Sequence, residues 1–279
     1  MQDRTLTAER IRDFACHLER EEKSAATCGK YLRDVRGFMG FAKGRPVTKE
    51  LVAAYKRDCV GRGYAVRSVN SMLASVNSLL NFLGWQDCKV KNVRLQRRTY
   101  CGEAEELTRS DYLRLLEAAR GDERLFLVLQ TICGAGIRVS ELRYFTVEAV
   151  REGEITVSCK NKTRTILIPC KLRKALLRYA KREQIISGPV FVGRQGKPLD
   201  RSQVWRQMKR LCAASGVQAS KVFPHNLRKL FARTFYALEK DIAKLADILG
   251  HSSINTTRIY IMTTGTEHQR KLDQMRLIL

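Results

Sequence analysis

The sequence predicts a mainly α-helical protein with one small β-hairpin, an α+β chain in two domains. Apolar residues recur at helical spacing over most of its 279 residues. The stretch EITVSCKNKTRTILIP, residues 154–169, alternates with a period of two and ends at a proline, which indicates two short strands and a turn. A basic segment without an apolar stripe separates two helical regions, so we expect domains at residues 1–86 and 107–279 joined by a linker at 87–106.

Four helices are expected in the first domain. Apolar stripes at helical spacing mark three of them, near residues 11–18, 31–39 and 69–83. Thr48 precedes a fourth helical stretch and has the side chain of an N-cap, whose oxygen accepts a hydrogen bond from a backbone N–H of the first turn. The first domain is therefore predicted to be a small helical bundle.

The linker expected at residues 87–106 is strongly basic. Its positive charges in the stretch from Gln86 to Tyr100 are Lys89, Lys91, Arg94, Arg97 and Arg98. Such a segment suits a strap that crosses DNA phosphates between two domains, and it equally suits a solvated linker. The sequence leaves both interpretations open.

The second domain is predicted to hold the hairpin and most of the remaining helices. Thr108 followed by Asp111 is typical of a capping box at the start of a helix at 111–119, and a strongly apolar helix follows at 125–133. Ile155 and Val157 before the polar turn, and Ile166 and Ile168 after it, supply the apolar face of the hairpin. Further helices are expected at 171–182, 201–214, 226–238, 241–249 and 266–277.

The charge of the chain points to a polyanion as partner. There are 52 Lys and Arg residues against 28 Asp and Glu residues, a formal net charge of +24 at pH 7. Both halves are basic, as expected if both contact one nucleic acid. The nine cysteines form no CxxC pair, which argues against a zinc ribbon, and no apolar run is long enough to span a membrane. We expect a cytoplasmic, nucleoid-associated protein.

Four polar motifs occur in a fixed order along the second domain. They are Arg138 in GAGIRVSEL, Lys160 and Lys162 in the hairpin, His225 and Arg228 in PHNLR, and His251 and Tyr260 in LGHSSINTTRIY. Each motif alone is common, because single basic residues are usually solvated and a glycine often follows the end of a helix. Together they supply several cationic donors that could reach a phosphate.

The ordered set resembles the catalytic pattern of the tyrosine recombinase family, which includes phage integrases and Xer-like enzymes. That pattern consists of an arginine, a hairpin lysine, HxxR, and LGH with a tyrosine nine residues beyond its histidine. The resemblance implies an N-terminal core-binding (SAM-like) DNA-binding domain, and a catalytic domain with a C-terminal tail. The chain differs from many relatives at Lys229, where they have histidine, and in a hairpin that is one residue shorter.

The resemblance implies a catalytic role for six residues. Arg138 and Arg228 would clamp the phosphate, His251 would donate to a phosphate oxygen, and Glu141 would support the site. His225 would act as base for Tyr260, which attacks to form a 3′-phosphotyrosine. Lys160 is predicted to protonate the leaving 5′ oxygen, although the short hairpin leaves Lys162 as an alternative. No cofactor or metal ion is expected.

The implied activity is site-specific DNA recombination, such as the integration or excision of a mobile element. Its expected substrate is double-stranded DNA with inverted-repeat core sites, bound by a homotetramer. The C-terminal tail is expected to dock in trans on a neighbouring subunit, although its apolar residues also suit packing on its own domain. Two rival functions remain, namely a catalytically silent DNA-binding or architectural protein and a type IB topoisomerase.

Overall fold

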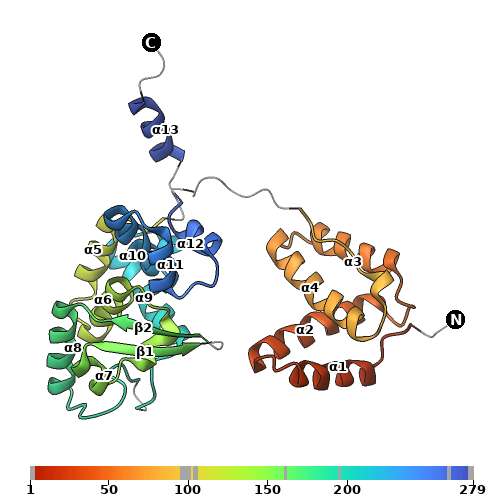
Figure 1. Cartoon of the computed structure of the whole chain (residues 1–279), viewed down its shortest axis with the longest axis horizontal. Helices are drawn as coiled ribbons and strands as arrows, with labels where there is room; N and C mark the ends of the chain where they lie inside the picture. Colours follow the sequence, from red (N-terminus) through yellow and green to blue (C-terminus); the bar gives the residue numbers. More distant parts are fainter. Residues whose placement is uncertain are drawn as a thin grey trace. The chain divides into compact units, whose positions relative to one another are not determined.

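The structure is a computed structural model of the chain, and it describes residues 4–94, 102, 106–159, 162–193, 196–262 and 265–275. The chain divides into two compact units, Met1–Arg97 and Arg98–Leu279, and each is described by itself (Figure 1). Helices dominate both units, and the second contains a two-stranded antiparallel sheet. The predicted mainly helical fold class is thus confirmed.

The first unit is a bundle of four helices followed by a single 3₁₀ turn. Its elements are α1 (Ala8–Arg20), α2 (Ala25–Ala42), α3 (Lys49–Gly61), α4 (Val66–Phe82) and η1 (Gln86–Cys88). The backbone N–H of Leu51 donates to the Thr48 hydroxyl over 3.2 Å, which confirms the predicted N-cap of α3. Phe14, Phe38 and Val76 are completely buried where α1, α2 and α4 meet.

The chain leaving the first unit lies along α4 and is held there by two asparagines. Asn77 exchanges hydrogen bonds with the backbone of Val90, and Asn70 does the same with Val93, over distances of 2.8 to 3.3 Å. Each side-chain amide thereby satisfies one N–H and one C=O of the exiting chain. The first part of the segment predicted to be a linker therefore packs on the first unit, whereas Arg97 and Arg98 lie outside the described residues.

The second unit places helices around a hairpin. Its elements are α5 (Arg109–Ala118), α6 (Glu123–Ala135), η3 (Val139–Tyr144), α7 (Val147–Glu152), β1 (Glu154–Cys159), β2 (Lys162–Leu167), α8 (Cys170–Arg182), α9 (Arg201–Ser215), η4 (Ala219–Lys221), α10 (Pro224–Glu239), α11 (Ile242–Leu249), α12 (Ile254–Tyr260) and α13 (Gly265–Gln274). The capping box predicted from Thr108 and Asp111 is present at the start of α5.

The register of the hairpin decides which side chains face the protein interior. Ile155 pairs with Ile166, and both are buried. Val157, also buried, pairs with Arg164. Because side chains two apart on a strand share a face, Arg164 belongs to the inward face of β2.

Gly136 lets α10 approach the end of α6 closely. The residue is left-handed, with φ of +61°, and a Cβ atom on it would lie 2.3 Å from the ring of Phe231 on α10. A side chain there would be both strained and in collision with the ring. Glycine at this position therefore brings the HxxR helix against the segment that carries Arg138.

Two helices in the second unit were not predicted. α7 and α12 have only six and seven residues, too few for an apolar stripe to repeat. Both have an N-cap that could have been read from the sequence, Thr146 for α7 and Ser253 for α12. Within the described part of the chain, no helix is both long and apolar enough to cross a membrane.

Candidate active site

Five of the six predicted catalytic residues lie on segments that meet at one end of α10. Arg138 precedes η3, His225 and Arg228 stand in the first turns of α10, His251 follows α11, and Tyr260 ends α12. Figure 1 shows α10, α11 and α12 packed together. The sixth residue, Lys160, lies outside the described residues, as does the side chain of Lys162.

A buried carboxylate, Glu141, lies at the centre of three arginines. It accepts hydrogen bonds from the Arg138 backbone N–H at 2.7 Å and from the Arg138 guanidinium at 3.0 Å. Arg164 donates to it at 2.6 Å, and Arg228 lies 3.9 Å away. Glu141 is 3% exposed, so these contacts occur with little competition from water. It supports the arginines, as the sequence suggested.

Arg228 is the most completely buried charged residue described, with 1% exposure. Its guanidinium donates to the carbonyl oxygens of Gly136 at 2.6 Å and Leu249 at 2.5 Å. Burial, and then the nearby charge of Arg138, lower the pKa of Arg228 to about 10, while Tyr260 and Glu141 act in the opposite direction. The group remains charged at neutral pH and joins the ends of α6 and α11.

His251 is oriented by contacts to both ring nitrogens. Arg228 lies 3.2 Å from its Nε2, and the hydroxyl of Thr257 lies 2.9 Å from its Nδ1. Since a guanidinium can only donate, Nε2 accepts and Nδ1 carries the proton in this state. Thr257, completely buried on α12, was not predicted. Its position on a short helix before the tyrosine gave no distinct signal.

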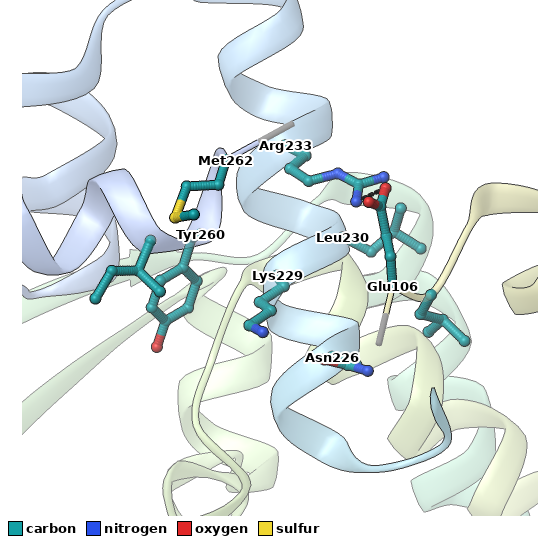
Figure 2. Close-up of a pocket in the computed structure, with 9 residues that line it drawn as sticks. Glu106, Asn226, Lys229, Leu230, Arg233, Tyr260 and Met262 are labelled. Atoms are coloured by element: carbon teal, nitrogen blue, oxygen red, sulfur yellow. Dashed lines mark ion pairs between the residues drawn. The ribbon is translucent and has the colours of Figure 1, made fainter. Parts of the chain in front are cut away.

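The ring of Tyr260 packs against both histidines. Its centroid lies 5.0 Å from that of His225 and 4.8 Å from that of His251. The residue is 8% exposed and belongs to a small apolar cluster with Leu245 and Leu249 of α11. The structure places Tyr260 at the end of α12. Figure 2 shows Tyr260 beside α10, with residues of that helix lining the same pocket.

Burial and nearby positive charges lower the pKa of both histidines. Burial and then the charges of Lys229 and Arg228 lower the pKa of His225 to about 4, although part of its side chain is exposed. Burial, followed by Arg228 and Arg138, likewise lowers the pKa of His251 to about 4. A neutral imidazole can accept a proton, and a bound phosphate would raise both pKa values by adding negative charge.

Arg164 is a site residue that the sequence analysis missed. One of its nitrogens donates to Glu141, and another donates to the carbonyl oxygen of Ile248 at the end of α11. A signal was present in the hairpin pattern, because Arg164 continues the inward alternation of Ile166 and Ile168. A charge at an inward strand position needs a buried partner.

The arrangement fits the binding of a phosphodiester. Arginines, neutral imidazoles and a tyrosine hydroxyl converge, and this donor set matches the charge and geometry of a phosphate. Among the described residues, no group of three or more His, Cys, Asp or Glu side chains is placed to hold a metal ion. This donor set, with a tyrosine among it, is suited to a phosphodiester ligand.

Comparison with known proteins assigns the family. Residues 105–266 match the phage integrase family, and residues 11–87 match the phage integrase N-terminal SAM-like domain. The chain belongs to the phage integrase family of tyrosine recombinases, and its relatives support the function of a site-specific DNA recombinase.

Three of the relatives cover 95% or more of the chain. Tyrosine recombinase XerA of Pyrococcus furiosus is 28% identical over 288 residues, covering 100% of this chain and 98% of that protein. XerA of Thermococcus kodakarensis is 30% identical, covering 95% and 94%. The crystal structure of XerA recombinase aligns with a TM-score of 0.55 at 25% identity, covering 98% and 100%.

A DNA-bound structure shares the fold more closely. A λ integrase dimer bound to a COC′ core site aligns with a TM-score of 0.76 at 18% identity, covering 94% of this chain and 96% of that one. At this identity the likeness concerns the fold alone.

The two arginines are expected to respond differently to removal. Arg138→Ala should change the free energy of unfolding by less than about 1 kcal/mol, because its side chain is 38% exposed. It should nevertheless lower the DNA cleavage rate about 10²-fold or more, as when a transition-state donor is lost. Arg228→Ala should cost about 3 kcal/mol of stability, since it leaves the buried carbonyl oxygens of Gly136 and Leu249 without their donor. Denaturant unfolding and a cleavage assay measure both effects, and equal stability losses would contradict the assignment.

Proposed function

We propose that the chain cuts and rejoins DNA at specific sites, using Tyr260 to form a covalent 3′-phosphotyrosine. The observation that carries this proposal is the packing of the Tyr260 ring against His225 and His251, next to the buried Arg228. A tyrosine hydroxyl is protonated at neutral pH and needs a base and a cationic surrounding to become a nucleophile. Both are supplied within this group of residues.

In the cleavage step the hydroxyl oxygen of Tyr260 bonds to phosphorus, and the bond from phosphorus to the 5′ oxygen breaks. His225 takes the proton of Tyr260, which suits its neutral state. Lys160 gives a proton to the departing 5′ oxygen, with Lys162 as the alternative donor. The number of phosphoester bonds is unchanged, so the step requires no nucleotide, and the arginines are proposed to supply the positive charge that stabilises the transition state.

Three groups stabilise the charge that builds on the phosphate oxygens. Arg138 and Arg228 are proposed to hold the non-bridging oxygens, and His251 to donate from Nε2. In the free protein this nitrogen accepts from Arg228. A phosphate would therefore have to take over that contact, and its negative charge favours the protonated imidazole that can donate.

Resolution of the intermediate decides the biological result. Attack by the 5′ hydroxyl of another duplex gives recombination, whereas return of the same strand gives the relaxation of a type IB topoisomerase. Family membership favours recombination. We therefore assign as substrate double-stranded DNA with inverted-repeat core sites, bound by a homotetramer and associated with the nucleoid. The formal charge of +24 supports extensive phosphate contacts.

The C-terminal helix is proposed to dock in trans on a neighbouring subunit. Leu272 and Met275 of this region are 46% and 56% exposed, so much of their apolar surface is accessible to a partner. Passing the segment from subunit to subunit in one direction closes a ring by cyclic symmetry. The short connection from Tyr260 to α13 would couple that docking to the position of the nucleophile.

Tyr260→Phe should abolish covalent complex formation while leaving DNA binding unchanged, because only the attacking oxygen is removed. The measurement is an SDS-resistant complex with a nicked suicide substrate, without metal ion or nucleotide. Tyr236→Phe, on α10, is the matched control and should react normally. A covalent complex formed by Tyr260→Phe would refute the nucleophile. The architectural alternative would be favoured if the unaltered protein bound the site but never formed the complex.

The two hairpin lysines are separated by a substrate with a bridging 5′ sulfur. Its thiolate leaves without a proton, so the substrate should restore cleavage by Lys160→Ala and should not alter the behaviour of Lys162→Ala. Single-turnover cleavage rates on the oxygen and sulfur substrates provide the comparison. Rescue of Lys162→Ala instead would assign the general acid to Lys162.

Truncation after Thr266 should leave binding to a single site largely intact, because the phosphate contacts lie elsewhere. It should abolish the synapsis of two sites and change the yield of cleavage. Gel-shift and synapsis assays test this, with Leu272→Ser as a variant that keeps the full length. Normal strand exchange without residues 267–279 would exclude a role in trans.

A further inference from the structure

Arg164 on β2 connects two parts of the site that are distant in sequence. Its guanidinium donates to Glu141 at 2.6 Å and, from a different nitrogen, to the carbonyl oxygen of Ile248. The side chain is 12% exposed. Glu141 in turn holds Arg138, while Ile248 lies three residues before His251. Arg164 thus contacts Glu141, which holds Arg138, and also the end of α11, the helix that positions His251.

Gly250 provides the space that this contact requires. It is left-handed, with φ of +61°, and a Cβ atom on it would lie 2.6 Å from Cδ and 3.0 Å from Nε of Arg164. The stem of Arg164 therefore packs directly on the backbone between α11 and His251. The carbonyl oxygen of Gly250 also accepts from Arg138 at 3.3 Å, so both arginines contact this turn.

We propose that Arg164 is a positioning residue for the cleavage reaction, holding His251 and, through Glu141, Arg138 in the geometry that receives the phosphate. This inference rests on the proposed function and assigns Arg164 no contact with DNA. It accounts for a charge on the inward face of β2, which an apolar side chain would otherwise occupy.

The contacts of Arg164 lie in two different directions, and this requires an arginine. A guanidinium presents several donors in a rigid fork and reaches a carboxylate and a carbonyl at once. A lysine keeps the positive charge beside Glu141 but has a single ammonium on a flexible stem. Arg164→Lys therefore preserves the charge balance and removes the geometry, which separates positioning from simple electrostatic stability.

A matched control exists on α8. Arg173 also donates to a backbone carbonyl, that of Arg151, and its guanidinium also lies against a left-handed glycine, Gly153. No residue of the candidate site takes part in these contacts. Arg173→Lys therefore reproduces the chemical change of Arg164→Lys without reaching the phosphate site.

The experiment measures DNA affinity, unfolding and single-turnover cleavage for both variants, with oxygen and 5′-sulfur substrates. Arg164→Lys should bind DNA within about twofold of the unaltered protein, because many other phosphate contacts remain. It should form the covalent complex at least tenfold more slowly, and the sulfur substrate should not rescue it, because the defect lies in the phosphate clamp. Arg173→Lys should cleave normally.

A second variant keeps the test open if Arg164→Lys fails to fold. Gly250→Ala displaces the Arg164 stem and should slow cleavage at least tenfold by itself, and normal cleavage by this variant would contradict the positioning role. Where Arg164→Lys folds, the effects of the two substitutions should not add. Normal cleavage by Arg164→Lys, or its rescue by the sulfur substrate, would overturn the positioning role. If the unaltered protein forms no covalent complex either, the proposed function fails instead, and the two failures are distinguishable.

Discussion

The interaction on which the site depends is the contact of one buried carboxylate with three arginines. Guanidinium groups repel one another, and burying one without a partner is costly. Glu141 reduces that cost by accepting from Arg138 and Arg164 and by lying 3.9 Å from Arg228. The protein can thereby hold positive charge ready for a phosphate before DNA arrives, and preorganised charge of this kind is the main source of catalysis in such chemistry.

Backbone geometry at two glycines makes this arrangement possible. Gly136 admits the ring of Phe231 and so brings α10, with Arg228, against the end of α6. Gly250 admits the stem of Arg164 beside the turn that carries His251. In each case a backbone carbonyl near the glycine accepts from an arginine of the site. The turns at Gly136 and Gly250 thus reverse the chain and also position the arginines of the site.

Much of this organisation was predictable from the sequence. Helical apolar stripes, the capping box at Thr108 and the alternating hairpin each repeat or combine enough residues to be recognised. The short helix α12 did not, because its seven residues are too few for an apolar stripe to repeat. Arg164 was missed because its two partners, Glu141 and Ile248, are 23 and 84 residues away in the sequence. The hairpin alternation indicates that Arg164 faces inward, but the identity of its partners is set by tertiary packing.

The most direct test of this account is the stability of Glu141→Gln measured by denaturant unfolding, beside Glu152→Gln at an exposed position of α7. The substitution keeps the shape of the side chain and removes the charge that balances three arginines. We expect Glu141→Gln to lose about 3 kcal/mol of unfolding free energy and the control to lose almost none. If both variants unfolded at the same denaturant concentration as the unaltered protein, the site would not depend on this carboxylate.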